Sequence, residues 1–202
     1  RGNEPGRSNI AAIGMWAHYA FVATQCSNIS SSKIISVDVS NPGSPKIIGQ
    51  SDCFSTPSRT ISVTNAEGIT RSSSFYQDQH HLVISESRAY VGVGGGVKVF
   101  DITTPAAPRL VSSLETEGVV LGMEADGSNV YVAEWLGDKG SKLLIIDASG
   151  PTPPVTATSV LFATPNYFHG LRIQATDGRV YVLHKGDLSK VVVHVVDAAT
   201  PA

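Results

Sequence analysis

One short pattern recurs along the chain, an aspartate followed by prolines four and seven residues later. It reads DVSNPGSP from Asp38, DITTPAAP from Asp101 and DASGPTPP from Asp147, and it begins again as DAATPA at Asp197. An aspartate side chain can accept hydrogen bonds from backbone amides two residues on, while proline fixes φ and removes a donor that a sheet would use. The pattern therefore predicts the end of a strand and a turn.

Four strand-like segments belong to each copy. Runs rich in β-branched and other apolar residues, such as KIISV and KLLII, precede the aspartates, and runs such as KIIGQ and RLVSSL follow them. Further upstream lie apolar segments such as HHLVI and VVLGME, each followed by a segment with a central aromatic residue. These aromatic residues are Phe21, Tyr90, Tyr131 and Tyr181. The repeating unit therefore contains four strands.

The spacing of the units indicates the fold. The aspartates lie 63, 46 and 50 residues apart (101 − 38, 147 − 101 and 197 − 147). A repeat of roughly forty to fifty residues with four strands is typical of propeller blades. We therefore predict an all-β fold, a β-propeller built of four-stranded antiparallel blades. The blades are expected at residues 10–50, 75–115, 118–163 and 168–202, after an N-terminal extension at 1–9.

The first step is longer because of an insertion at residues 51–74, which is polar and rich in Ser and Thr. Its only strand-like part is ISV at 61–63, so we interpret it as a long loop between blades. The fourth unit stops within its turn, and RGNEPGRSN at the N-terminus is a poor candidate for the missing outermost strand. We expect about four blades forming an arc of a six- to eight-bladed ring, completed by further sequence or by another chain.

Two segments carry a resemblance to a known family. AYVGVGGGVKVFDITTPAAP and VYVAEWLGDKGSKLLIIDASGPTPP resemble LVIVD repeats, which form bacterial and archaeal β-propellers. The resemblance covers nearly the whole chain after about Asn9. It implies a propeller and a surface-exposed or secreted interaction protein. A fold does not by itself assign chemistry, so the function must be argued from a site.

Composition limits the function classes. Charged residues make up 16% of the chain, against about 25% in an average globular protein. The net charge of −2 gives no basic field for nucleic acid. No apolar run approaches the roughly 18 residues that span a bilayer, and RGNEPGRS lacks the apolar core of a signal peptide. We expect a single extracellular or cell-surface domain with no nucleic acid partner and no membrane span.

The two cysteines, Cys26 and Cys53, flank the outer half of the first unit. Cys26 follows the aromatic strand and Cys53 follows the strand KIIGQ, so a bridge between them is geometrically conceivable. An exported protein favours such a bridge. Sequence alone leaves it open against two separate thiols.

Enzyme signatures give little support for catalysis. The glycines of GVGGGVKV, at residues 92–99, link two strands rather than opening a helix, so they do not form a dinucleotide-binding loop. G-x-S-x-G, H-E-x-x-H and C-x-x-C are absent from the chain. Glu134, Asp138 and Asp187 are interpreted as solvated turn residues, too few per loop for calcium. We predict no cofactor and no catalytic residue.

Three histidines suggest an alternative, a metal site at the propeller axis. His80 and His81 begin the first strand of the second unit, and His169 begins that of the fourth. The first strand of each blade lines the central channel, so these imidazoles could converge as ligands for Cu, Zn or Fe. The plainer interpretation is that they are polar residues at the rim. The unit between them offers no His at the same place.

Aromatic residues offer a candidate binding surface. Tyr167 lies beside His169 and could stack on a sugar or a peptide. Trp135 falls in AEWLGDKGS, which we interpret as a partly exposed loop, where Trp would serve as an anchor or fold back over the blade.

The favoured function is a non-catalytic extracellular or cell-surface module for a protein or carbohydrate ligand. It would present loops and channel-mouth side chains, among them His80, His81, His169, Tyr167 and Trp135. One alternative is a metal-dependent, oxidoreductase-like enzyme with its histidines at the axis. Another is a structural subunit whose blade edges join other chains by strand addition.

Overall fold

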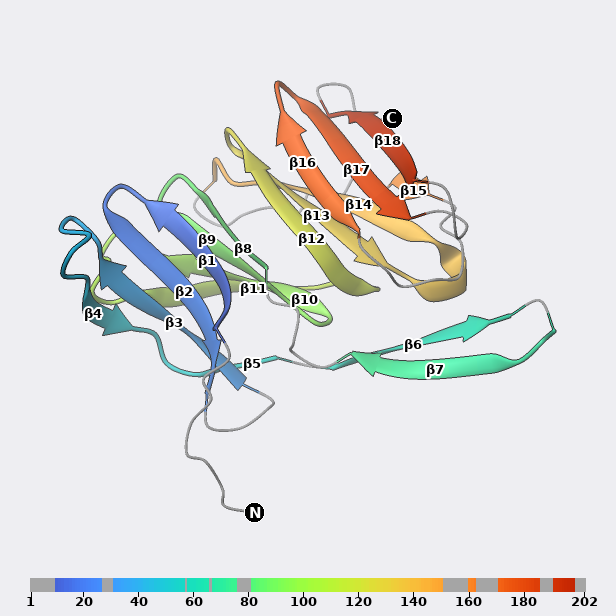
Figure 1. The fold of residues 1–202 in the computed structure, drawn as a ribbon, viewed down its shortest axis with the longest axis horizontal. Coiled ribbons are helices and arrows are strands. Elements are labelled where there is room, and N and C mark those ends of the chain that lie inside the picture. The colour runs from blue at the N-terminus through green and yellow to red at the C-terminus, as the bar shows by residue number, and fades with distance from the viewer. Residues whose placement is uncertain are drawn as a thin grey trace, which may run out of the picture.

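The computed structural model describes residues 10–26, 31–56, 58–65, 67–75, 81–150, 160–162, 171–185 and 191–198. The described chain is almost entirely antiparallel β-sheet, which confirms the predicted fold class (Figure 1). Within each of the four blade sheets, consecutive strands are hydrogen-bonded neighbours. In the described part of the chain, no helix has the length and apolarity needed to cross a membrane.

Each repeat folds as one sheet, which we call a blade. Blade 1 contains β1 (Ile10–Trp16), β2 (Tyr19–Gln25), β3 (Ser31–Asp38) and β4 (Lys46–Gln50), with β5 (Phe54–Ser55) also paired to β3. Blade 2 contains β8 (His81–Ser85), β9 (Arg88–Val93), β10 (Gly96–Asp101) and β11 (Arg109–Glu115). Blade 3 contains β12 (Val119–Asp126), β13 (Asn129–Trp135), β14 (Ser141–Asp147) and β15 (Val160–Phe162). In blade 4 the described strands are β16 (Arg172–Thr176), β17 (Arg179–Lys185) and β18 (Val191–Asp197).

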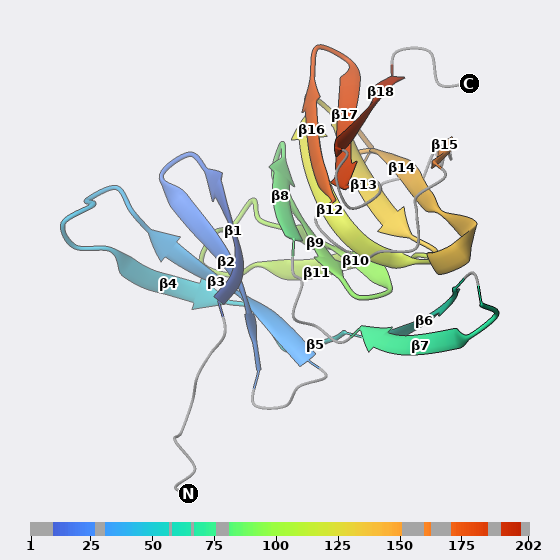
Figure 2. The ribbon, with the colours of Figure 1, turned by 45° about the vertical axis from the view of Figure 1, so that its right-hand side comes forward.

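The first strands of successive blades stand side by side. β1 contacts β8, β8 contacts β12, and β12 contacts β16, so the blades follow one another in chain order (Figure 2). This is the arrangement of a propeller, in which the first strand of each blade lies nearest the axis. The core consequently lies between blades rather than inside any one of them.

Three apolar clusters fill the spaces between neighbouring blades. Phe21 and Ile34 of blade 1 pack with Val91 and Phe100 of blade 2. A second cluster joins blades 2 and 3 around Tyr90, and a third joins blades 3 and 4 around Tyr131. The alternation of a strand sends successive side chains to opposite faces, so every inner blade contributes to two clusters.

The aspartate–proline pattern forms the expected turn. Oδ1 of the aspartate accepts a hydrogen bond from the backbone N–H two residues on in three repeats, at Asp38 (2.9 Å), Asp101 (2.9 Å) and Asp147 (2.8 Å). The same residue lowers the pKa of each carboxyl, mainly through the backbone of Ser40 at Asp38 and through the side-chain hydroxyls of Thr103 and Ser149 at Asp101 and Asp147. In blades 1 and 2 the turn leads from the third strand to the fourth, as predicted.

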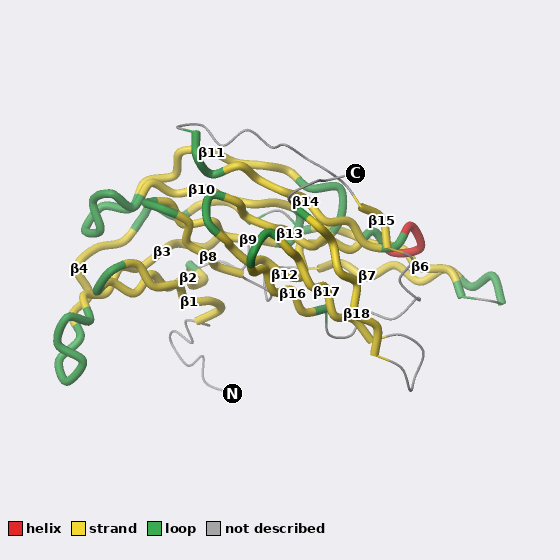
Figure 3. Tube along the Cα trace, turned by 90° about the horizontal axis from the view of Figure 1, so that it is seen from above, coloured by secondary structure: helices red, strands yellow, loops and turns green. Residues whose placement is uncertain are grey.

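The insertion differs from its prediction as a long loop. β6 (Arg59–Thr64) and β7 (Thr70–Phe75) pair as an antiparallel hairpin that lies across one end of the blades (Figure 1). Seen from above, the short 3-10 turn η1 (Gly137–Lys139) lies beside β6, which it contacts (Figure 3). The loop interpretation was wrong because Ser and Thr can occupy an exposed strand face when the opposite face packs on a surface.

Candidate functional site

The outward face of the β6–β7 hairpin carries a ladder of hydroxyl groups. Three cross-strand pairs of hydroxyl oxygens lie within hydrogen-bonding distance, at 3.0, 2.8 and 2.9 Å. The pairs are Thr60 with Ser74, Ser62 with Ser72, and Thr64 with Thr70. Five of these six residues are exposed, and Thr64 is partly buried. Each hydroxyl can donate and accept, so the ladder presents a regular polar surface to solvent.

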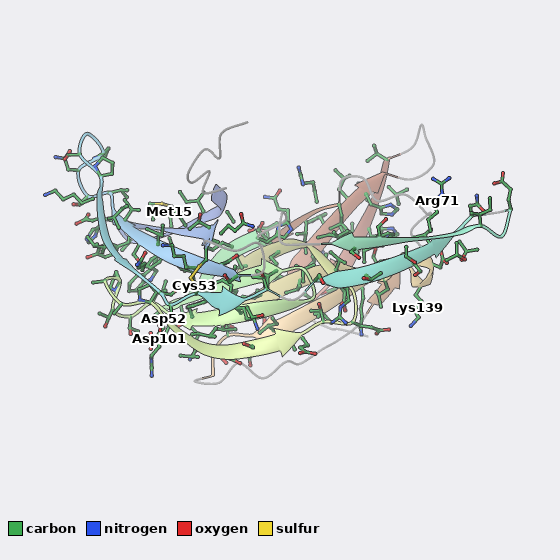
Figure 4. All side chains as sticks on the ribbon, turned by 90° about the horizontal axis from the view of Figure 1, so that it is seen from below. Met15, Asp52, Cys53, Arg71, Asp101 and Lys139 are labelled. Carbon is green, nitrogen blue, oxygen red and sulfur yellow. A yellow bond between two sulfur atoms is a disulfide. The ribbon has the colours of Figure 1, made fainter. Side chains whose placement is uncertain are left out.

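The opposite face of the hairpin is anchored to blades 2 and 3. The guanidinium of Arg59 donates to the backbone carbonyl of Thr116 and, at 3.5 Å, to that of Gly95. At the other end of β6, the backbone N–H of Thr64 donates to the two carboxylate oxygens of Asp138, at 2.9 and 3.1 Å. The hairpin is thus held at both ends of one strand, while Arg71 projects from β7 (Figure 4).

Between these two anchors, Ile61 of the hairpin packs on Trp135 and Val119. Trp135 is the last residue of β13 and is only 6% exposed. The predicted loop is therefore wrong, and of the two alternatives for Trp135, an exposed anchor or a side chain folded back over the blade, its burial contradicts the anchor. The hairpin covers the indole, and this contact joins residues 74 positions apart in the sequence (135 − 61), which no local pattern reveals.

The residue before Trp135 on β13 carries a buried carboxylate. Glu134 has no exposed surface, and its Oε2 accepts a hydrogen bond from the backbone N–H of Gly118 at 2.6 Å. Its Oε1 lies 3.9 Å from Nζ of Lys142, which also approaches Glu117 at 3.5 Å. Burial raises the pKa of Glu134, and the Gly118 hydrogen bond and the Lys142 charge oppose this only in part. The prediction of a solvated turn residue was wrong here, because the residue lies on β13.

Two histidines that the sequence analysis did not single out face each other in blade 4. The Nε2 atoms of His184 and His194 are 2.8 Å apart, and the two rings stack with centroids 4.9 Å apart. Burial, followed by the nearby His184, lowers the pKa of His194. A pair of imidazoles is fewer than the three or four ligands of a protein zinc site. Strand pairing, not sequence spacing, brings the two residues together.

Of the histidines and the tyrosine predicted at the mouth of the channel, the structure describes only His81. His81 begins β8 and is half-buried, whereas His80, Tyr167, His169 and the acidic residue Asp187 lie outside the described residues. Among the described residues, no three His, Cys, Asp or Glu side chains are grouped closely enough to hold a metal ion. Convergence of the three predicted histidines therefore stays a prediction.

The structure joins Cys26 and Cys53 in a disulfide, with the Cα atoms 6.4 Å apart. The bridge ties the end of β2 to the segment that leads into β5 and the hairpin. It lies at the same end of blade 1 as the start of β3. Of the two alternatives that the sequence left open, the structure contains the bridge.

Comparison with known proteins identifies the repeat. The LVIVD repeat matches residues 9–52, 78–116 and 123–161, which correspond to blades 1, 2 and 3. The chain belongs to the LVIVD repeat family. The comparison with curated proteins returned no match.

The LVIVD-repeat chain is similar in fold to solved structures of low sequence identity. The computationally designed Ika4 protein matches with a TM-score of 0.55 and 13% identity, over 96% of each chain. AztD from Citrobacter koseri matches with a TM-score of 0.53 and 16% identity, over 95% of this chain and 44% of AztD. An engineered GH43 glycoside hydrolase matches at a TM-score of 0.45 and 9% identity, over 96% of this chain and 39% of the hydrolase. The first two likenesses concern the fold alone.

Proposed function

We propose that the chain is a non-catalytic binding module of an extracellular or cell-surface protein. Its binding surface is the hydroxyl ladder of the β6–β7 hairpin, and its ligand is a carbohydrate or an extended polypeptide. The observation that carries this proposal is that an exposed, regular row of paired hydroxyls is fixed on a rigid scaffold. Loops and insertions on rigid scaffolds are where binding functions concentrate.

The anchoring of the hairpin supports a binding role. Ordering a flexible segment on binding costs free energy, and a surface that is already ordered avoids that cost. Arg59, Ile61 and Asp138 hold the inner face of β6, so the hydroxyls on the outer face keep their spacing. A ligand with hydroxyl or amide groups would then exchange water for several aligned hydrogen bonds.

The proposed location is supported by the disulfide. Bridges such as Cys26–Cys53 persist in oxidising compartments and are rare where glutathione keeps thiols reduced. The low share of charged residues, 16%, fits a scaffold that works by contact rather than by electrostatic steering.

Binding to an array of cell-surface glycans and extended peptides tests the proposal. The variant carrying Thr60→Ala, Ser62→Ala and Thr64→Ala removes one side of the ladder and keeps the backbone contact to Asp138. We expect the parent to bind one of the two ligand classes and the variant to bind at least about tenfold more weakly. Ser73→Ala is the matched control, because Ser73 pairs with Ile61 on the opposite face of the hairpin. No binding by the parent, or equal binding by the triple variant, would contradict the proposal.

A further inference from the structure

Each blade has two faces, and the two faces pack on different neighbours. We call the face turned toward the following blade the leading face, and the face turned toward the preceding blade the trailing face. Blade 1 places Phe21 and Ile34 on its leading face, against Val91 of blade 2. Blade 2 places Tyr90 and Val97 on its leading face, against blade 3. The same kind of interface therefore repeats along the arc.

Among the described residues, the leading face of blade 4 has no such cover. Equivalent positions in the four blades show this. The second strand of each blade carries the aromatic residue of the repeat, and the position two residues after it pairs with one residue of the third strand. It is Ile34 in blade 1, Val97 in blade 2 and Leu143 in blade 3, each 0% exposed. In blade 4 it is Val193, which is 54% exposed. Val191 and Val195, on the same face, are 68% and 58% exposed.

The described part of the chain also leaves the trailing face of blade 1 uncovered. In the first strand of each blade, one residue pairs with the position just after the aromatic residue. This residue is Leu82 in blade 2 and Met123 in blade 3, which are 8% and 6% exposed. In blade 1 it is Ile13, which is 62% exposed, and its neighbour Met15 is 54% exposed (Figure 4). Ile47 on β4 lies in line with Met15 across the sheet, because successive strands pair at these positions, and it is 72% exposed.

We propose that a second copy of this chain covers both faces. The leading face of blade 4 of one copy packs on the trailing face of blade 1 of the other, and the reverse contact closes the assembly. Exposed apolar faces mark interaction surfaces, and their removal from water favours association. A second copy fits because the two open faces are the two halves of one interface type, already formed three times within the chain.

The number of copies follows from ring closure. Closed propellers have roughly four to eight blades, and the described residues of this 202-residue chain form four blade sheets. One copy would close only if its end blades packed on each other, whereas Ile13 and Val193 are exposed. Two copies complete eight blades, related by a two-fold axis along the channel. A contact between two different faces produces a closed ring when the rotation completes a circle.

The mass of the 202-residue chain in solution, measured by light scattering over a range of concentrations, tests this proposal. We expect twice the 21.2 kDa of one chain. Ile13→Glu and Val193→Glu place a charge on one open face each, and we expect either change to raise the dissociation constant by at least about 100-fold. Ile69→Glu is the matched control, because Ile69 is 52% exposed and lies at the hairpin, away from both faces.

Several results would overturn the proposal. These are a parent mass of 21.2 kDa at every concentration, a mass that grows without limit, or a loss of assembly in only one of the two variants. The last result would mean that identical faces pair. An equimolar mixture of the two variants, in which each retains one intact face, should form a pair through a single interface. Circular dichroism checks that both variants stay folded, and glycan binding at the hairpin is measured separately, because the assembly does not depend on it.

Discussion

At the scale of single residues, Glu134 shows how burial changes the chemistry of a side chain. Its carboxylate has no exposed surface, yet it is held by one backbone N–H and one ammonium group. Burying a charged group is costly unless it is paired and hydrogen-bonded. Its neighbour Trp135 is buried through a long-range contact with Ile61 of the hairpin.

Replacing Glu134 should separate hydrogen bonding from charge. Glu134→Ala leaves the N–H of Gly118 without its acceptor, and we expect a loss of about 2 kcal/mol in the free energy of unfolding. Glu134→Gln keeps an oxygen acceptor and should cost less. Chemical denaturation at pH 7 measures both. An equal loss for Glu134→Gln and Glu134→Ala would show that the charge, which both variants remove, matters more than the hydrogen bond.

Glu134 should also make the free energy of unfolding depend on pH in one direction. The pKa of Glu134 is raised above its ordinary value of 4.5, so the folded state holds its proton to higher pH than the unfolded state. Stability therefore falls as pH rises from about 4.5 through the raised pKa. We expect this part of the pH dependence to be missing in Glu134→Gln. Plots of the free energy of unfolding against pH that stay parallel for the two proteins above pH 4.5 would contradict the assigned direction.

Residues such as Glu134 and Trp135 set the limit of prediction from sequence at this scale. The aspartates of the turns were predictable, because their partners lie two residues away. The burial of Trp135 was not, because Ile61, which covers it, comes from an insertion outside the repeat. The His184–His194 pair was missed for a similar reason, since strand pairing decides which side chains meet.

At the scale of elements, the hairpin is attached to the blades through few contacts. We expect Ile61→Ala to weaken its docking, because Ile61 supplies the apolar contact to Trp135. The indole should then become more exposed, which red-shifts its fluorescence, and the amides of β6 and β7 should exchange faster. Ile69→Ala, at an exposed position of the hairpin, should change neither. Unchanged fluorescence and exchange in Ile61→Ala would mean that Arg59 and Asp138 hold the hairpin by themselves.

The disulfide constrains a different element. It closes a loop of 27 residues between β2 and the segment before β5. We expect Cys53→Ser to lower the free energy of unfolding by about 3 kcal/mol, through the greater freedom of the unfolded chain. A reducing agent should destabilise the parent by a similar amount and leave a Cys26→Ser, Cys53→Ser variant unaffected. A parent that is insensitive to reduction would contradict this prediction.

The blade strands were predictable from sequence because each is defined by local patterns that repeat. β9 and β13, for example, carry the same aromatic residue in the same setting, and the turns after β10 and β14 begin with the same aspartate. β6 and β7 were not predicted beyond ISV, because their composition is typical of a loop. Their structure depends on the surface of blades 2 and 3, which does not exist until those blades have folded.

At the scale of the whole molecule, the first and last described blades differ from the two blades between them. Blades 2 and 3 bury both of their faces, whereas blade 1 and blade 4 each leave one apolar face exposed. The hairpin lies at one end of the blades, apart from these open faces (Figure 2). Assembly and ligand binding can therefore occur on separate surfaces of the same molecule.

The central claim is the proposal that the four described blades of this LVIVD-repeat chain form an arc that a second copy completes. Electron microscopy of the purified 202-residue chain tests it most directly. The account predicts closed rings of eight blades around a central channel, with two hairpins on opposite sides of the ring. Isolated four-bladed arcs, closed four-bladed rings or open filaments would contradict it.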